Sequence, residues 1–316
     1  MKIHIILLFI VVAMMRVIQQ VCEKLVSNEV SGAENFFAYG AFYQYMAALF
    51  ALVTVLFTGF YGFNFGLIVC SFLCAILFGV DLFACMEAVK GCSLAVLSMF
   101  SLGGLVLSII VSYFWFNEPI SVFQIIGLIV FFVAAYLLLS YDKKSNIKIS
   151  FKTFTSLLVS FFANGLIMIV QKYFALKVNE ANTPLFSLLT FFLCGTMMII
   201  SFAFTRLKTK RKTNENENGI LNTKERVLNK KLIICGSLLA VAVFLINIII
   251  TEMGKTVPSI IVFPVSTAIS VLIATLVGCL IFKDKLTTKK IAGIILGVIS
   301  IVIISVFTPE NISTLF

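Results

Sequence analysis

Charged residues are scarce in this sequence, and histidine is almost absent. Of the 316 residues only 12% are charged, and His4 is the single histidine. A soluble domain carries about 25% charged residues. With 61% apolar residues and a mean hydropathy of +1.11, a soluble chain would have too little interior for its apolar side chains. Soluble, disordered, fibrous and disulfide-scaffold classes are therefore excluded, as are histidine-based catalysis and histidine metal clusters.

Nucleotide-binding and catalytic motifs are also missing. The sequence has no P-loop, no GxGxxG after a strand and no HExxH. The eight cysteines lie in or beside apolar runs, and Cys70 and Cys74, which share a helical face, have no histidine or acidic neighbours there, so packing is a better interpretation than metal binding. We expect no enzyme, no cofactor, no metal and no nucleic-acid partner.

Long apolar runs are what the sequence has in abundance. A membrane-spanning helix needs about 20 mostly apolar residues, and ten such runs follow one another with short connections. We therefore predict an all-α polytopic protein of the plasma membrane, with ten transmembrane helices and the lipid bilayer as its surroundings. The predicted spans are residues 3–22, 35–58, 63–86, 92–116, 120–140, 151–174, 183–205, 231–251, 258–282 and 289–308. Residues 206–231 form a polar, basic stretch, which we interpret as a solvated loop.

The second half of the chain repeats the first. Phe116-Asn-Glu118 corresponds to Phe282-Lys-Asp284, 166 positions later, and Arg16 and Lys24 correspond to Asn164 and Lys172, 148 positions later. The small residues Gly104, Ser108 and Ser112 recur as Ser270, Ala274 and Gly278, a pattern that lets membrane helices approach closely. We predict two five-helix domains, 1–145 and 146–316. Because five is odd, the second is inverted in the membrane, as in alternating-access transporters.

The end of the fourth predicted helix resembles a known family. Trp115-Phe-Asn-Glu118, Pro119, a short turn and then Gly127 in the fifth helix resemble one EamA domain. Phe282-Lys-Asp284, Gly293 and Gly297 resemble a second copy, with Asp284 where Glu is usual. Together they resemble the ten-helix drug/metabolite transporter superfamily. This resemblance implies small-molecule transport and leaves the substrate open.

Ionisable side chains within spans are costly and mark candidate sites. In the first helix Arg16, Gln19, Gln20, Glu23 and Lys24 share one face. Arg16 is the leading candidate for contacting an anionic group, because its guanidinium pairs bidentately with carboxylate or phosphate. The alternative is a structural ion pair between Arg16 and Asp81. Lys24 either lines the site or extends to the interface.

Further candidates lie on other helices. Asn164 and Gln171 are predicted to line the cavity, whereas Lys172 is placed at the membrane edge. Asp81 has Asn247 as its repeat counterpart, and it either binds a coupling cation or forms a buried ion pair. Tyr39 and Tyr43 share a face, and they either stack on a ligand or belong to the interfacial aromatic belt. The full set of predicted substrate-binding residues is Arg16, Gln20, Tyr39, Tyr43, Asp81, Asn164, Gln171 and Asn247.

Basic residues are distributed unevenly between the two membrane faces. The face carrying the 206–231 loop holds 19 Lys and Arg, and the face carrying both termini holds 4. The positive-inside rule therefore places both termini outside the cell, whereas members of the resembling family usually keep them in the cytoplasm. The two orientations remain open.

The most specific function consistent with these features is secondary transport. We predict that the chain moves a small polar metabolite or drug by alternating access. The alternatives are a non-transporting scaffold or sensor with the same fold, and a flippase for lipid-linked substrates. The fifth and tenth helices carry no interior charge, so we expect them at the periphery, packed on their own half, with a homodimer as an open possibility.

Overall fold

The computed structural model describes residues 3–27, 29–30, 32–60, 62–92, 94–139, 150–178, 182–215, 229–281 and 288–307. The described residues form ten α-helices. These are α1 (Ile3–Val26), α2 (Ala33–Thr58), α3 (Phe65–Val89), α4 (Leu94–Phe116), α5 (Val122–Leu139), α6 (Phe151–Lys177), α7 (Thr183–Glu215), α8 (Lys230–Thr256), α9 (Ser259–Ile281) and α10 (Thr288–Val306). The all-α prediction and the ten helices are confirmed, with most boundaries within a few residues.

Five helices among the described residues are long and apolar enough to cross a membrane. They are α2, α3, α6, α8 and the part of α7 from Thr183 to Lys208. Large apolar side chains such as Phe57, Phe65 and Leu280 are exposed over the outside of the bundle, which water would not tolerate but hydrocarbon does. The chain is therefore an integral membrane protein.

Asparagine or serine side chains begin three of these helices. Asn64 accepts a hydrogen bond from the Leu67 N–H at 2.7 Å, and Asn229 accepts one from the Leu232 N–H at 2.9 Å. Ser150 caps α6 in the same way through the Lys152 N–H. Such caps satisfy backbone groups that a helix leaves unpaired at its start.

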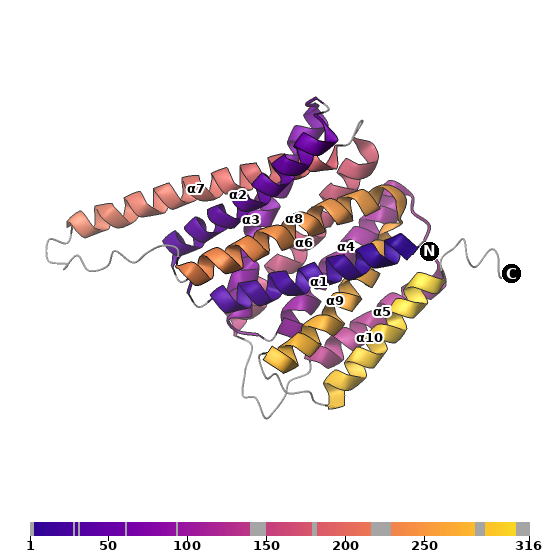
Figure 1. Ribbon diagram of the computed structural model, residues 1–316. Coiled ribbons are helices and arrows are strands. Elements are labelled where there is room, and N and C mark those ends of the chain that lie inside the picture. Colours follow the sequence, from indigo (N-terminus) through magenta and orange to yellow (C-terminus); the bar gives the residue numbers. More distant parts are fainter. Residues whose placement is uncertain are drawn as a thin grey trace.

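The bundle is intertwined between its two sequence halves (Figure 1). α1 packs on α8 and α9, α6 packs on α3 and α4, and the most extensive contact of all joins α2 to α7. The start of α1 and the end of α10 lie at one end of the bundle, and α7 projects beyond the bundle at the other (Figure 1). The first helix of each half therefore packs on the opposite half.

Glycines let α4 and α6 meet backbone to backbone. A Cβ added to Gly104 would lie 2.5 Å from the Gly165 nitrogen, and one added to Gly165 would lie 2.7 Å from the Gly104 oxygen. Ser108, one turn after Gly104, donates to the Gly165 carbonyl at 3.2 Å. The close approach predicted from the small residues of α4 is confirmed, and its partner is α6.

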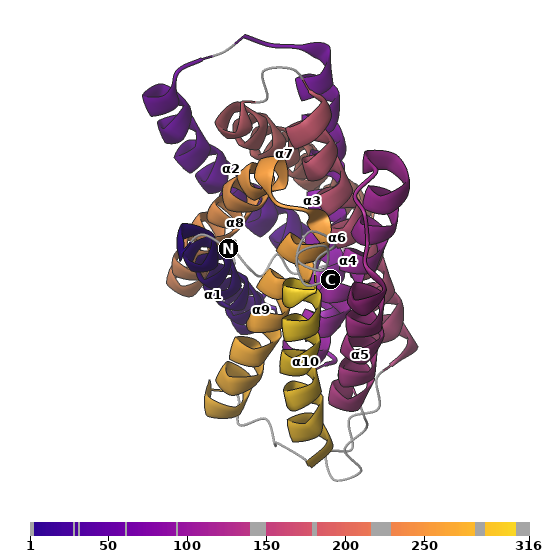
Figure 2. The ribbon, with the colours of Figure 1, turned by 90° about the vertical axis from the view of Figure 1, so that its right-hand side faces the viewer.

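Two predictions need correction, one about α5 and α10 and one about residues 206–231. α5 and α10 lie at one edge (Figure 2), but they pack mainly on each other rather than on their own halves; Phe123 stacks on Phe307 with ring centroids 4.9 Å apart. The 206–231 stretch is also helical as far as Glu215, since Lys, Arg and Glu favour helix wherever no Gly or Pro interrupts them. Residues 216–228 lie outside the described part.

Candidate functional site

The polar face of α1 points into the bundle. Gln20 and Glu23 are buried, and the Gln19 amide donates to Glu23 Oε1 at 3.0 Å across one helical turn. This face packs towards α8 and α9, with α3 also in contact. An acidic and a basic side chain on one buried face need partners from neighbouring helices.

Asp81 on α3 interacts electrostatically with this face. Its carboxylate accepts a hydrogen bond from Ser160 of α6 at 2.7 Å and a longer one from the Cys85 thiol at 3.6 Å. Arg16 and Glu23 both lie within electrostatic range of Asp81. Ser160 was not a sequence candidate, because its role depends on a contact 79 positions away.

Arg16 and Asp81 do not form the direct ion pair considered as the structural alternative. Among the described residues Arg16 belongs to no ion pair, and its Nε has no hydrogen-bond partner. Asp81 satisfies its carboxylate with neutral donors instead. The guanidinium therefore sits near an acid without being neutralised by contact.

Two tyrosines of α2 extend this cluster. Tyr39 and Tyr43 are buried, with ring centroids 6.0 Å apart, so the interfacial-belt interpretation is wrong for both. Tyr43 accepts a hydrogen bond from the Gln44 amide at 2.7 Å, and Glu23 lies within electrostatic range of both rings. The α1, α2, α3 and α6 side chains thus form one polar cluster, which we call the Arg16–Asp81 cluster: Arg16, Gln19, Glu23, Tyr39, Tyr43, Gln44, Asp81, Cys85 and Ser160.

Several buried polar atoms of this cluster are left without partners. Glu23 Oε2, the Tyr39 hydroxyl and Gln44 Oε1 have none among the described residues, like Arg16 Nε. Over nine in ten buried polar groups in folded proteins are paired, and a buried donor or acceptor left unpaired costs about 1–3 kcal/mol. Four of the eight such atoms among the described residues lie in this one cluster, which makes it the candidate functional site.

Gln171 and Asn247 belong to a separate series of hydrogen-bonded side chains. Gln171 of α6 donates to Asn247 Oδ1 of α8 at 2.6 Å, and Asn247 donates to Ser187 of α7 at 2.7 Å. All three side chains are buried. This second group of predicted site residues thus links helices α6, α7 and α8 through hydrogen bonds among its own side chains. The remaining candidates, Gln20 and Asn164, are buried on α1 and α6.

Lys172 is buried in the protein rather than extended to solvent. It is only 4% exposed, pairs with Glu118 at 2.8 Å and donates to the Val257 carbonyl at 3.1 Å. Asn117 before Glu118 adopts a left-handed conformation (φ 53°), which asparagine tolerates better than most residues, and the Glu118 N–H reaches back to the Ser112 carbonyl. The turn after α4 thereby directs Glu118 towards α6. Spacing along one helix could not show this, because the partner comes from another half.

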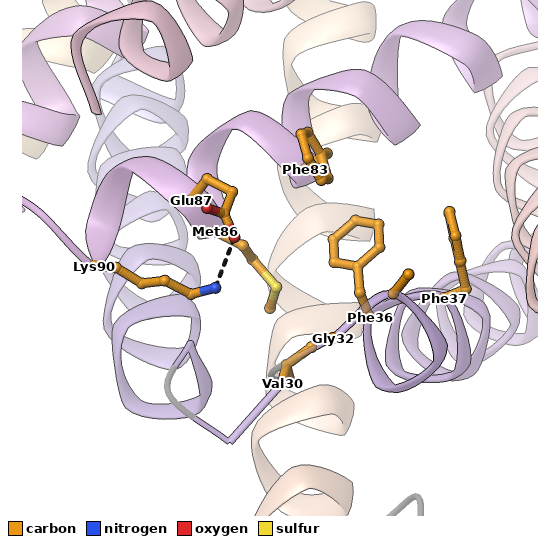
Figure 3. Close-up of a pocket in the computed structure, with 9 residues that line it drawn as sticks. Val30, Gly32, Phe36, Phe37, Phe83, Met86, Glu87 and Lys90 are labelled. Atoms are coloured by element: carbon orange, nitrogen blue, oxygen red, sulfur yellow. Dashed lines mark hydrogen bonds and ion pairs between the residues drawn. The ribbon is translucent and has the colours of Figure 1, made fainter. Parts of the chain in front are cut away.

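Two adjacent hollows lie between α2, α3 and α7, away from these clusters. The first has a volume of about 190 Å³ and includes Met86, Glu87 and Lys90 in its lining (Figure 3). The second, of about 310 Å³, is lined by apolar side chains including Ile76, Val80 and Met198. Both are lined by Phe36, Phe37 and Phe83. The first is lined by α2, α3 and the segment before α2, and α7 contributes only to the second. Sequence reasoning did not find them, because they depend on how these helices pack together.

Comparison with known proteins gives a fold and no family. Neither a family model nor a curated protein sequence matches this chain. A solved crystal structure, described only as that of a protein, aligns with a TM-score of 0.65 over 96% of this chain and 96% of that chain, at 11% identity. A likeness at this identity shows a shared fold alone. The chain is therefore a helical membrane protein whose fold recurs in a solved structure.

Proposed function

We propose that this chain is a secondary transporter for a small polar metabolite, built from two inverted five-helix repeats and working by alternating access. The interhelical contacts support the repeat. Exchanging α1–α5 with α6–α10 turns the contact of α3 with α6 into that of α8 with α1, and the contact of α4 with α6 into that of α9 with α1. The contacts of α2 with α7 and of α5 with α10 map onto themselves. The resemblance to drug/metabolite transporters gives the same arrangement.

The observation that carries the proposal is the set of unpartnered polar atoms in the Arg16–Asp81 cluster. Arg16 Nε offers a donor, whereas Glu23 Oε2 and Gln44 Oε1 offer acceptors. Arg16 lies about 20 Å along α1, at 1.5 Å per residue, and thus well within a hydrocarbon core about 30 Å thick. A solute with both a negative and a hydrogen-bond-donating group fits such a cluster at the midplane, where inverted-repeat transporters bind substrate.

The change Arg16→Lys tests this function. It keeps the charge and loses the bidentate geometry, so binding should weaken by about 1–3 kcal/mol while the melting temperature stays near that of the wild type. Arg206→Lys, the same change at an exposed position of α7, is the control. The measurements are ligand-induced thermal shift across a metabolite library and transport into proteoliposomes.

A structural role for Arg16 gives a different pattern. Arg16→Gln would then lower the melting temperature without affecting transport, and Arg16→Gln with Asp81→Asn would restore it. That result would support the non-transporting scaffold or sensor. Failure of every library compound to shift the melting temperature of the wild type would support the same alternative.

A flippase is the second candidate, favoured by the two hollows between α2, α3 and α7. The 310 Å³ hollow includes exposed apolar residues such as Ile76 and Val80, so an amphiphile could enter it sideways from the bilayer. Movement of a fluorescent lipid between leaflets of proteoliposomes, absent with empty liposomes, would favour this candidate over the metabolite transporter.

The orientation proposed from charge places the 206–231 segment in the cytoplasm and both termini outside, in the plasma membrane. A cysteine at Asn216 should then resist an impermeant thiol reagent in intact cells and react after lysis. Reaction in intact cells would reverse the orientation and leave the fold unaffected. A homodimer through α5 and α10 is part of the same proposal, since their outer faces are apolar and exposed at Ile129, Phe132, Ile295 and Ile299.

A further inference from the structure

The two hollows between α2, α3 and α7 form one groove with a charged end and an apolar end. Because both hollows include Phe36, Phe37 and Phe83 in their lining, they adjoin. Glu87 and Lys90 lie at the end of α3, and Phe83 and Met86 lie one turn further in (Figure 3). From Lys90 to Ile76 the groove follows α3 for about 21 Å, at 1.5 Å per residue. That length exceeds one leaflet of hydrocarbon, which is roughly 15 Å, half of the 30 Å core.

The charged end has a net positive charge. Lys90 and Lys152 both pair with Glu87, at 2.7 and 2.5 Å, so two cations converge on one carboxylate. Lys152 is 76% exposed and Lys90 is 32% exposed, which leaves donors of both available to a further anion.

The apolar end is open to the surroundings of the protein. Ile76, Val80 and Phe83 are 41%, 40% and 55% exposed, whereas Cys194 at the floor is buried. Gly79 has no side chain to fill the groove, and a Cβ there would lie 3.1 Å from Met198 Cε. A hydrocarbon chain lying between α3 and α7 would contact these side chains along its length.

We propose that this groove binds one anionic phospholipid of the bilayer, with its phosphate at Lys90 and Lys152 and an acyl chain against Ile76, Gly79, Val80 and Phe83. The charge at the mouth selects an anionic headgroup over a zwitterionic one, because near a membrane each basic residue favours anionic lipid about fivefold. The site is independent of the proposed transport function, since it shares no residue with the Arg16–Asp81 cluster.

Brominated lipids test the site through tryptophan fluorescence. Trp115 is the only tryptophan, so Trp115→Phe with Phe83→Trp places a single reporter in the groove. Trp115→Phe with Leu238→Trp is the matched control. Leu238 is an exposed residue about two turns after the start of α8, and Phe83 lies about two turns before the end of α3, on the same face of the membrane. Both variants are reconstituted in phosphatidylcholine nanodiscs containing the same minor fraction of brominated phosphatidylglycerol or brominated phosphatidylcholine.

At the groove reporter we expect phosphatidylglycerol to quench at a concentration about fivefold lower than phosphatidylcholine, and at the control we expect no difference. Lys90→Gln with Lys152→Gln and Glu87→Gln, which removes the net charge without stranding the acid, should abolish the preference. Gly79→Leu, which fills the groove by displacing only the flexible end of Met198, should reduce quenching by both lipids.

Equal quenching by the two lipids at the groove reporter would overturn the proposal. So would an anionic preference that survives Gly79→Leu, or one that is as large at Leu238→Trp. A groove reporter that neither lipid reaches, in a protein that runs as a dimer, would assign the groove to a second copy of the chain.

Discussion

Three ion pairs among the described residues join the sequence halves, and two of them, at opposite ends of the bundle, differ mainly in burial. Lys172 and Glu118 meet at 2.8 Å with exposures of 4% and 15%, whereas Lys231 and Glu29 meet at 2.6 Å with exposures of 48% and 32%. The chemistry is the same, but solvent and salt screen only the second pair effectively. The end that carries Lys172 is therefore the more firmly closed of the two.

The partners of each lysine show how the difference arises. Lys172 also donates to the Val257 carbonyl, so α6, the turn after α4 and the end of α8 meet at one ammonium group. Lys231 and Asn229 both donate to Glu29, yet all three lie at the surface, where holding long side chains in place offsets much of the attraction. For an alternating-access protein, this asymmetry indicates a conformation closed at the Lys172 end.

The largest effect is expected at the buried pair. Lys172→Gln leaves Glu118 without its cation in a largely buried place, and breaking such a pair costs about 3–5 kcal/mol. Thermal unfolding in detergent should show a large fall in melting temperature. Adding Glu118→Gln should recover much of it. A single variant as stable as the wild type would remove the difference between the two ends.

An intermediate effect is expected at the uncharged, hydrogen-bonded side chains of Gln171, Asn247 and Ser187. Asn247→Leu leaves the Gln171 amide and the Ser187 hydroxyl without the bonds they make at 2.6 and 2.7 Å, at a cost of about 1–3 kcal/mol. The control is Ser150→Ala at the exposed start of α6, where only a cap is lost, worth about 1 kcal/mol. Equal losses in the two variants would contradict the burial argument.

The smallest effect is expected at the exposed pair. The Lys231 and Asn229 donors hold the pKa of Glu29 below its ordinary value. Its contribution to stability is therefore present at neutral pH and is lost as the pH falls through that lowered pKa, below the ordinary value of about 4.3. Glu29→Gln should cost about 0.2–1 kcal/mol at low salt and almost nothing at high salt. Unfolding measured against pH and salt checks both, and a loss that persists in high salt would show that this end is closed as firmly as the other.

Apolar runs determined how much of this fold could be predicted. Each helix is long and apolar, so its position follows from composition, and even the close approach at Gly104 followed from small residues at every fourth position. The end of α7 could not be placed in this way, because a run such as Lys208–Lys212 is solvated whether it is helical or not. Hydropathy detects burial in lipid, and it does not detect backbone conformation in water.

The sequence identified individual residues of the candidate site, but it did not identify the residues that they contact. Arg16 and Asp81 were found because charge within a span is costly, and that argument needs no partner. The partners themselves depend on how helices from the two halves are placed against each other. Ser160 beside Asp81 is an ordinary serine in the sequence, and Lys172 near the end of its run resembles a residue extending to the interface. Their roles follow from tertiary contacts alone.

The contact between Gly104 and Gly165 determines which parts of the molecule can move as rigid units. Two helices whose backbones touch cannot roll over each other without first separating, and separation would break the Ser108 bond to Gly165. α4 and α6 thus travel together although they belong to different halves of the sequence, and α3, packed on α6, travels with them. A rocking motion would then turn α3, α4 and α6 against α8, α9 and α1. Each moving unit therefore contains helices from both halves of the sequence. Dividing the chain between residues 145 and 146 would separate helices that belong to one unit.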